Sequence, residues 1–227
     1  DDGSTLWITF VGERLCWGFV DGTPPSPDTD GDGVWRSIAG GWRWSDLNGE
    51  NLTKDCLSGA LTKLAAYRGT SCNVGQADYI VLRINGEKAP AVNRALAASS
   101  EMKNATLDLM RLLQPNDFEL LVDLVFTTSG WRRIGTIGKT QKTLDMDLVL
   151  PSTGERAFVQ VKSATTSKEL AEYVGTLDGS PFHKMFYVFH SGEATTDDER
   201  VSVIGPEALA ELVMDAGLTG WLIRKVS

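Results

Sequence analysis

Histidine and paired cysteine are scarce in this chain of 227 residues. It has two histidines, His183 and His190, and three cysteines, Cys16, Cys56 and Cys72, with no CxxC pair among them. Structural zinc sites and disulfide frameworks need several such ligands at close spacing, so the sequence argues against both. Hydrolases that depend on a histidine base or on histidine-bound zinc are disfavoured for the same reason. Unpaired cysteines are typical of a reducing, cytoplasmic environment.

Long apolar runs are also missing. No stretch approaches the 18 or so apolar residues that a membrane-spanning helix needs, and we expect no membrane partner. The chain starts at Asp1 without a basic-then-apolar leader, and a trimmed N-terminus with a lost address signal stays open. Hydrophobic residues make up 42% of the chain and charged residues 23%, which is typical of a well-cored soluble protein. This length predicts one large domain or two modest ones.

Positive charge is in short supply as well, since the formal net charge is −8. Nucleic-acid binding rests largely on the neutralisation of phosphates, so this charge argues against a nucleic-acid partner. The local field at a site matters more than the sum, however. One basic cluster occurs and contains Arg132, Arg133, Lys139 and Lys142. It is interpreted either as a nucleic-acid contact or as a solvated basic loop.

Residues 1–90 carry strand-like patterns rich in tryptophan and glycine. The expected strands are 6–11, 15–20, 34–38, 41–44 and 79–84, the last closed by an Asn-Gly turn. One inserted helical pattern places Leu57, Leu61 and Leu64 on a single face. We therefore predict a β-rich, barrel-like α+β domain.

The rest of the chain has a helical pattern first, and then strands that alternate with helices. Residues 88–113 are rich in alanine and leucine and predict a helix, of which 91–106 form a connector. Pro115 begins a second helix that ends at Gly130, and its apolar stripe is Phe118, Leu121, Val122 and Val125. Further strands are expected at 146–150, 157–161, 184–190, 201–204 and 220–226, and further helices at 167–174 and 206–216. This order predicts an α/β domain with a mixed sheet over residues 107–227.

One predicted hairpin of that domain carries carboxylate groups on its first strand and an amide and an ammonium group on its second. Asp145 and Asp147 are two residues apart and project to the same side of a strand. Gln160 and Lys162 alternate in the same way on the partner strand. Pairing across the turn would join Asp147, Gln160 and Lys162. Metal-assisted phosphodiester hydrolysis needs carboxylates that hold Mg²⁺ and a group that orients the attacking water, and this set supplies both.

These residues resemble a known signature. Asp147-Leu-Val-Leu, a short turn and Phe158-Val-Gln-Val-Lys162 are similar to the D…QxK version of the PD-(D/E)xK motif in Mrr-type restriction endonucleases. The segment Pro115-Asn-Asp-Phe-Glu119 resembles the helix that opens that fold. The resemblance covers about the last 115 residues and implies a restriction-endonuclease-like fold that cleaves DNA with Mg²⁺, for which Mn²⁺ can substitute.

The resemblance also implies roles. Asp147 would be the principal metal ligand, with Asp145 the competing candidate, and the carbonyl of Val161 would complete the inner shell. Gln160 stands where many relatives have glutamate. Lys162 would orient water and stabilise phosphate charge, and Glu119 would support the metal from its helix. The alternative without chemistry is that the aspartates cap a hairpin and Lys162 is solvated.

The N-terminal half offers candidate DNA contacts. Tryptophans in a small β domain are usually core, but Trp17, Trp42 and Trp44 could also stack a flipped or modified base. Lys63 and Arg68 would lie near phosphates if this domain binds DNA. The half is loosely similar to PUA-like reader domains, by analogy alone.

Together these features predict a reader domain followed by a Mg²⁺-dependent endonuclease that acts in restriction or defence, and a homodimer would let it cut both strands. The alternative is a catalytically degenerate nucleic-acid-binding protein that keeps the nuclease fold. DNA and RNA are not distinguished by these residues.

Overall fold

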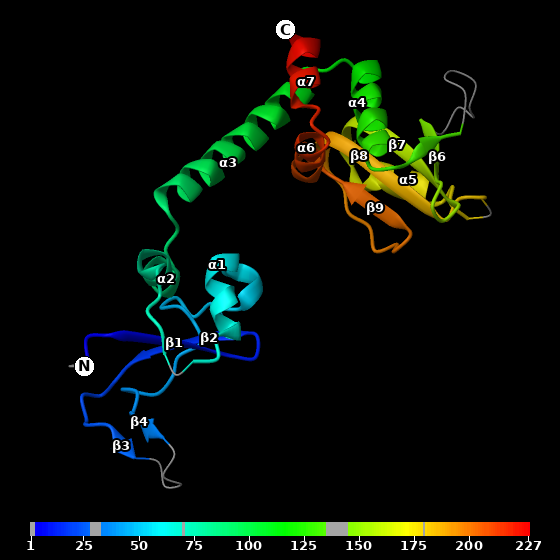
Figure 1. The fold of residues 1–227 in the computed structure, drawn as a ribbon. Coiled ribbons are helices and arrows are strands. Elements are labelled where there is room, and N and C mark those ends of the chain that lie inside the picture. The colour runs from blue at the N-terminus through cyan, green and yellow to red at the C-terminus, as the bar shows by residue number, and fades with distance from the viewer. Residues whose placement is uncertain (1–2, 28–32, 70, 135–144, 179) are drawn as a thin grey trace. The chain divides into compact units, whose positions relative to one another are not determined.

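The computed structural model describes residues 3–27, 33–69, 71–134, 145–178 and 180–227 (Figure 1). The chain divides into two compact units, an N-terminal unit, Asp1–Arg94, and a C-terminal unit, Ala95–Ser227. The predicted basic residues Lys139 and Lys142 lie outside the described residues.

The N-terminal unit begins with an antiparallel hairpin of β1 (Leu6–Val11) and β2 (Arg14–Phe19). Gly12 occupies the left-handed region with φ +58° at the turn, which favours glycine because it lacks a Cβ. A second pair joins β3 (Ser26–Pro27) to β4 (Val34–Trp35). Within the described part of this unit the strands form two separate two-stranded sheets. The closed barrel expected from the sequence is therefore not observed.

Helical segments pack on the first hairpin. They are η1 (Lys54–Cys56), α1 (Gly59–Thr62), η2 (Lys63–Ala66) and α2 (Ala77–Ile84). The strand expected at 79–84 was wrong, since these residues belong to α2. Ile80 and Ile84, four residues apart, are buried while Val81 is 47% exposed, a spacing that fits one face of a helix and alternate positions of a strand alike. The buried isoleucines join Leu15, Trp17, Leu52, Leu57 and Leu61 in one core.

Two helices lead into the C-terminal unit. Helix α3 (Pro90–Arg111) confirms the helix expected over 88–113, and α4 (Pro115–Thr128) confirms the one that starts at Pro115. The predicted stripe of α4 is buried as expected and comprises Phe118, Leu121, Val122 and Val125. Pro115 suits the first turn, where its missing N–H has no helical partner to lose.

A five-stranded mixed sheet forms the centre of this unit, in the order β5-β6-β7-β8-β9 (Figure 1). Its strands are β5 (Arg132–Arg133), β6 (Met146–Leu150), β7 (Glu155–Thr166), β8 (Lys184–Glu193) and β9 (Val201–Ile204). The first three pair antiparallel, and β7, β8 and β9 pair parallel. Helix α5 (Ser167–Val174) follows β7 directly. The α/β class predicted from the sequence is confirmed.

Helices cover both faces of the sheet. One face, with Val159, Val161 and Val188, packs against α4 and against α6 (Pro206–Asp215). The other carries Phe158, Met185 and Tyr187 and packs against Leu170 of α5. Successive strand residues point to opposite faces, which explains why β7 is buried on both sides.

The last element is a helix, α7 (Thr219–Val226), where the sequence predicted a strand over 220–226. Leu222 is buried, and Leu218 and Val226, four residues to either side, pack on the same core cluster. That spacing fits a helix. Among the helices of the described ranges, none is both long and apolar enough to cross a membrane.

Candidate functional site

The candidate site lies where β6 and β7 separate. The β6–β7 register pairs Met146 with Val159, and Asp145 precedes β6 directly. The Asp145 carboxylate oxygen Oδ2 accepts a hydrogen bond from Gln160 Nε2 at 2.5 Å and another from the backbone N–H of Val161 at 2.7 Å. One aspartate therefore binds both a side chain and the main chain of the predicted QxK segment.

A second carboxylate is in electrostatic range of the first. Phe118 of α4 points into the core, and the next residue, Glu119, is half-buried. Burial and then the charge of Asp145 raise the pKa of Glu119, against the opposing effect of Arg133. Burial also raises the pKa of Asp145, although its bonds to Val161 and Gln160 and the charge of Lys162 oppose the shift. Burial is the larger cause of the raised pKa at both carboxyl groups, and the charge of Asp145 adds to it at Glu119.

The oxygen donors at this place suit Mg²⁺. The amide oxygen Oε1 of Gln160 is buried and has no hydrogen-bond partner, so a neutral oxygen ligand remains unused beside Asp145. Mg²⁺ takes oxygen ligands, keeps several waters and needs only one or two carboxylates. In the described part of the chain, no three His, Cys, Asp or Glu side chains gather closely enough to hold a metal ion. A metal at Asp145 would thus depend on the Gln160 amide, or on a main-chain carbonyl, as well as on carboxylates.

Lys162 follows on the same face of β7, where alternate residues project. Its Nζ lies 2.9 Å from Glu169 Oε1 and 5.0 Å from the ring centroid of Tyr173. Burial acts to lower the pKa of Lys162, but hydrogen bonds to Tyr173 and Glu169 outweigh it and raise the pKa well above its ordinary value. Lys162 is therefore a fixed cation at neutral pH.

Asp147 lies apart from this cluster. Its Oδ2 accepts a hydrogen bond from Arg156 Nη2 at 2.6 Å, and it pairs with Phe158 across the hairpin. The structure thus brings Asp145, and not Asp147, to Gln160 and Val161. These contacts favour Asp145, the competing candidate, at this place. Asp147 stays a prediction as the principal metal ligand, and its Oδ1 is buried without a hydrogen-bond partner.

Two residues of the basic cluster, Arg132 and Arg133, lie in the described part of the chain, and Arg133 has contacts within the protein. Arg133 donates from Nη2 to the backbone oxygen of Asp145 at 3.0 Å, and its Nη1 lies 4.0 Å from Asp123 Oδ1. This side chain ties β5 to the site and is half-buried. Arg132 is exposed, so it is the arginine of the pair that remains open to a nucleic-acid phosphate.

The tryptophans of the N-terminal unit separate into two kinds. Trp17 is 3% exposed, and its indole N–H donates to the Ser45 oxygen at 2.8 Å. Its predicted role as a base contact is wrong, because it is part of the core. Trp42 and Trp44 are 40% and 51% exposed and flank Arg43, whose guanidinium lies 5.1 Å from the Trp17 ring centroid.

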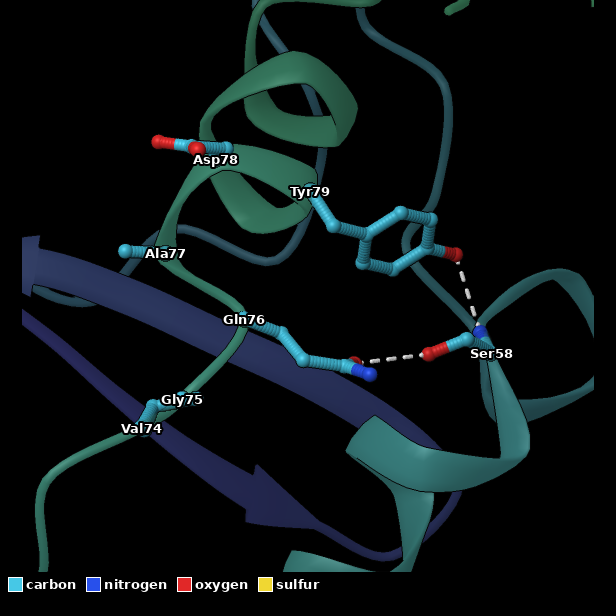
Figure 2. Close-up of a pocket in the computed structure, with 7 residues that line it drawn as sticks. All are labelled: Ser58, Val74, Gly75, Gln76, Ala77, Asp78 and Tyr79. Carbon is cyan, nitrogen blue, oxygen red and sulfur yellow. Dashed lines mark hydrogen bonds between the residues drawn. The ribbon is translucent and has the colours of Figure 1, made fainter.

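The other predicted contacts of this unit, Lys63 and Arg68, are exposed. A small pocket of about 340 Å³ lies between the start of α1 and the start of α2. Figure 2 shows Gln76 and Tyr79 turned toward Ser58, whose N–H donates to the Tyr79 hydroxyl at 2.9 Å and whose Oγ donates to Gln76 Oε1 at 3.0 Å. These bonds join two helices, and the pocket includes none of the predicted residues.

Sequence reasoning missed Glu169 and Tyr173. One signal was available, since Thr166-x-x-Glu169 is a helix N-cap pattern in which the glutamate usually reaches back to the cap. The Thr166 hydroxyl does accept from the Glu169 N–H, at 3.4 Å. The Glu169 carboxylate turns instead to Lys162 and to Thr165.

Comparisons with known proteins give little. No protein-family model and no curated protein matches the chain. A solved structure described as MspJI restriction endonuclease in complex with a 27-mer oligonucleotide is similar with a TM-score of 0.32 and 16% identity, over 70% of this chain and 39% of that one. The chain spans less than half of that structure, and a TM-score at this level decides neither fold nor activity.

Proposed function

We propose that the C-terminal unit is a divalent-metal-dependent endonuclease that hydrolyses DNA. The observation that carries the proposal is the contact of Asp145 with Gln160 and Val161, next to the fixed cation Lys162. The order along the chain, with Glu119 on the preceding helix and an aspartate before Gln160-Val161-Lys162, resembles the PD-(D/E)xK pattern of the Mrr type, although the aspartate matched to that pattern is Asp147. The sheet carries these groups on rigid elements, as a hydrolytic site requires.

In this proposal Asp145 holds Mg²⁺ together with the Gln160 amide oxygen and the Val161 carbonyl, and Mn²⁺ can substitute. Glu119 supports the site from α4. Bound there, the metal would polarise the scissile phosphate and make water a better nucleophile.

The chain's own groups then act by position and charge. Lys162 is a permanent cation, so it stabilises the negative charge that develops on the phosphate and orients water through its N–H donors. It does not serve as a general base at neutral pH, because a base must be largely deprotonated there. Gln160 contributes no charge, which leaves Asp145 as the main anionic ligand.

We extend the proposal to the N-terminal unit as a DNA-binding module. The exposed Trp42 and Trp44 support it, because aromatic side chains stack on bases of any sequence. Arg132, Lys139 and Lys142 are the phosphate contacts proposed for the nuclease unit. Restriction of foreign or modified DNA and assembly as a homodimer complete the proposal.

Two observations favour a second candidate, a non-catalytic DNA-binding protein with a degenerate nuclease fold. Gln160 replaces a carboxylate at a ligand position, and the formal net charge is −8. The neutral amide supplies less charge to a metal ion than a carboxylate would, and the negative net charge opposes the binding of phosphates.

Cleavage of methylated and unmethylated plasmid with Mg²⁺ or Mn²⁺ tests the proposal, with wild type compared with Asp145→Ala and Lys162→Ala. Cleavage by wild type that is lost in both variants supports the nuclease. A difference between the two plasmids implicates the N-terminal unit in recognition. DNA binding without cleavage by wild type under all these conditions favours the non-catalytic candidate.

A further inference from the structure

We infer that Glu169 and Tyr173 of α5 are positioning residues that hold the Lys162 ammonium where the scissile phosphate binds. The inference rests on the proposed nuclease function. It assigns to α5 a role in catalysis beyond covering the sheet.

A lysine needs such positioning at a phosphate site. Its ammonium is a point charge on a flexible stem with several rotatable bonds, so without partners it samples many positions. Electrostatic stabilisation of a transition state works best when the charge is already in place. The Lys162 side chain is 25% exposed, so water alone would leave it mobile.

Glu169 is itself anchored to buried groups. Its Oε1 lies 2.9 Å from Lys162 Nζ, and its Oε2 accepts from the Thr165 hydroxyl at 3.2 Å. Thr165 and Tyr187 are buried at 6% and 0% exposure, and their hydroxyls are 2.5 Å apart. The chain of bonds therefore runs from the core of the sheet to the ammonium.

Tyr173 fixes the ammonium from another direction. It follows Glu169 by one helical turn on α5, and such residues lie on the same helix face. Lys162 Nζ lies 5.0 Å from its ring centroid, within the range of a cation–π interaction. A carboxylate and an aromatic ring together limit the positions of the ammonium more than either would alone.

Two substitutions of Glu169 distinguish an effect of side-chain position from an effect of side-chain charge. Glu169→Asp keeps the charge but removes one methylene, so its carboxylate cannot reach both Thr165 and Lys162. Glu169→Gln keeps the length and loses the charge. If position is what matters, both variants lower kcat for Mg²⁺-dependent plasmid cleavage, by about 10- to 100-fold as for other outer-shell partners. KM for DNA changes by less than about 3-fold, because the lost interaction belongs to the transition state.

Glu172→Gln is the matched control, since Glu172 is exposed on the same helix and loses the same charge. It should keep the wild-type kcat. Wild-type kcat in Glu169→Asp with loss in Glu169→Gln would show that charge alone acts and overturn the inference, as would wild-type kcat in both. Loss of kcat in Glu172→Gln equal to that in Glu169→Gln would overturn it too.

A thermal-unfolding cycle of Lys162→Met, Glu169→Gln and the double variant gives a readout that does not need activity. Coupled side chains give a Tm shift in the double variant smaller than the sum of the single shifts. Additive shifts overturn the inference even if the enzyme cleaves DNA. If wild type cleaves no DNA while the shifts are non-additive, the proposed function fails, and the Lys162–Glu169 contact is structural.

Discussion

Arg156 donates a hydrogen bond from Nη2 to the Asp147 carboxylate at 2.6 Å. The Asp147 side chain is 15% exposed and that of Arg156 36%. Asp145, two residues earlier, has different partners, Gln160 and the backbone of Val161.

The two aspartates should respond in opposite ways to the same change. Asp145→Asn keeps the shape but loses the charge that would hold Mg²⁺ in the proposed site, and we expect plasmid cleavage to fall by about 100-fold or more, as when a principal electrostatic group is removed. Asp147→Asn should keep cleavage and lose about 1–3 kcal/mol in the free energy of unfolding, because it leaves the Arg156 guanidinium without its charged partner. Urea denaturation and plasmid cleavage of both variants test this. Loss of cleavage in Asp147→Asn alone would restore the original assignment.

The preference for Asp147 rested on the family resemblance, in which a strand directly follows the aspartate. Placing Asp147 opposite Gln160 would need partner numbers along the hairpin that sum to 307. In the structure Leu150 pairs with Glu155, the sum is 305, and position 145 falls opposite Gln160. Turn geometry fixes this register, and a shift of two residues keeps every side chain on its face. The hydrophobic pattern therefore predicts both registers equally well.

Elements with a full amphipathic stripe were predictable from the sequence. Helices α4 and α5 and strands β6 and β9 begin where they were expected. The segments at 79–84 and 220–226 were assigned as strands and are helices. Each is a short apolar run, for which a period of 2 and a period of 3.6 fit almost equally well until the packing partner is known. Glu169 was missed for a related reason, because its partner Lys162 lies on another element.

Gly192 should tolerate alanine poorly. It lies on β8 with φ +90° and pairs with Thr165 of β7, and an added Cβ would overlap the backbone of Thr165. Strain in the left-handed region contributes about 1–2 kcal/mol, and the overlap adds to it. Gly192→Ala should therefore lower the free energy of unfolding by more than about 2 kcal/mol.

Gly154→Ala is the control for that measurement. Gly154 has φ +74°, and nothing lies within 4 Å of an added Cβ, so only the backbone term of about 1–2 kcal/mol applies. Urea denaturation of both variants separates the two contributions. Equal losses would show that the β7–β8 pair can shift to accommodate the methyl group.

His190 should make stability depend on pH. It is 7% exposed, its ring meets Phe118 edge-on at 4.5 Å between centroids, and its Nδ1 lies 2.9 Å from Ser191 Oγ. Burial lowers the pKa of His190 below its ordinary value of 6.5, against a favourable hydrogen bond to its own backbone. The unfolded chain then binds the proton more readily than the folded one. The contribution of His190 to stability is present above pH 6.5 and is lost as the pH falls through the folded pKa.

Urea midpoints at pH 7.5, 6.5 and 5.5 test this dependence. His190→Gln removes the titrating ring, so the decrease in midpoint between pH 7.5 and 5.5 should be smaller than in wild type. His183→Gln is the control, because His183 is exposed, and it should keep the wild-type slope. An unchanged slope in His190→Gln would contradict the prediction.

Substitutions of a buried and of an exposed tryptophan in the N-terminal unit should differ in their effects on stability and on DNA binding. Trp17 is buried and hydrogen-bonded to Ser45, so Trp17→Ala should destabilise the chain by about 3–5 kcal/mol through the cavity it leaves.

Trp44 is 51% exposed, and Trp44→Ala should leave the urea midpoint nearly unchanged. If Trp44 stacks on a base, the same variant weakens DNA binding by about 1–3 kcal/mol, which is roughly a 5- to 150-fold rise in Kd. Binding measured with Ca²⁺ in place of Mg²⁺ should limit cleavage during the titration. Wild-type affinity in both Trp44→Ala and Trp42→Ala would exclude base stacking by these tryptophans and leave Lys63 and Arg68 as the predicted DNA contacts of the N-terminal unit.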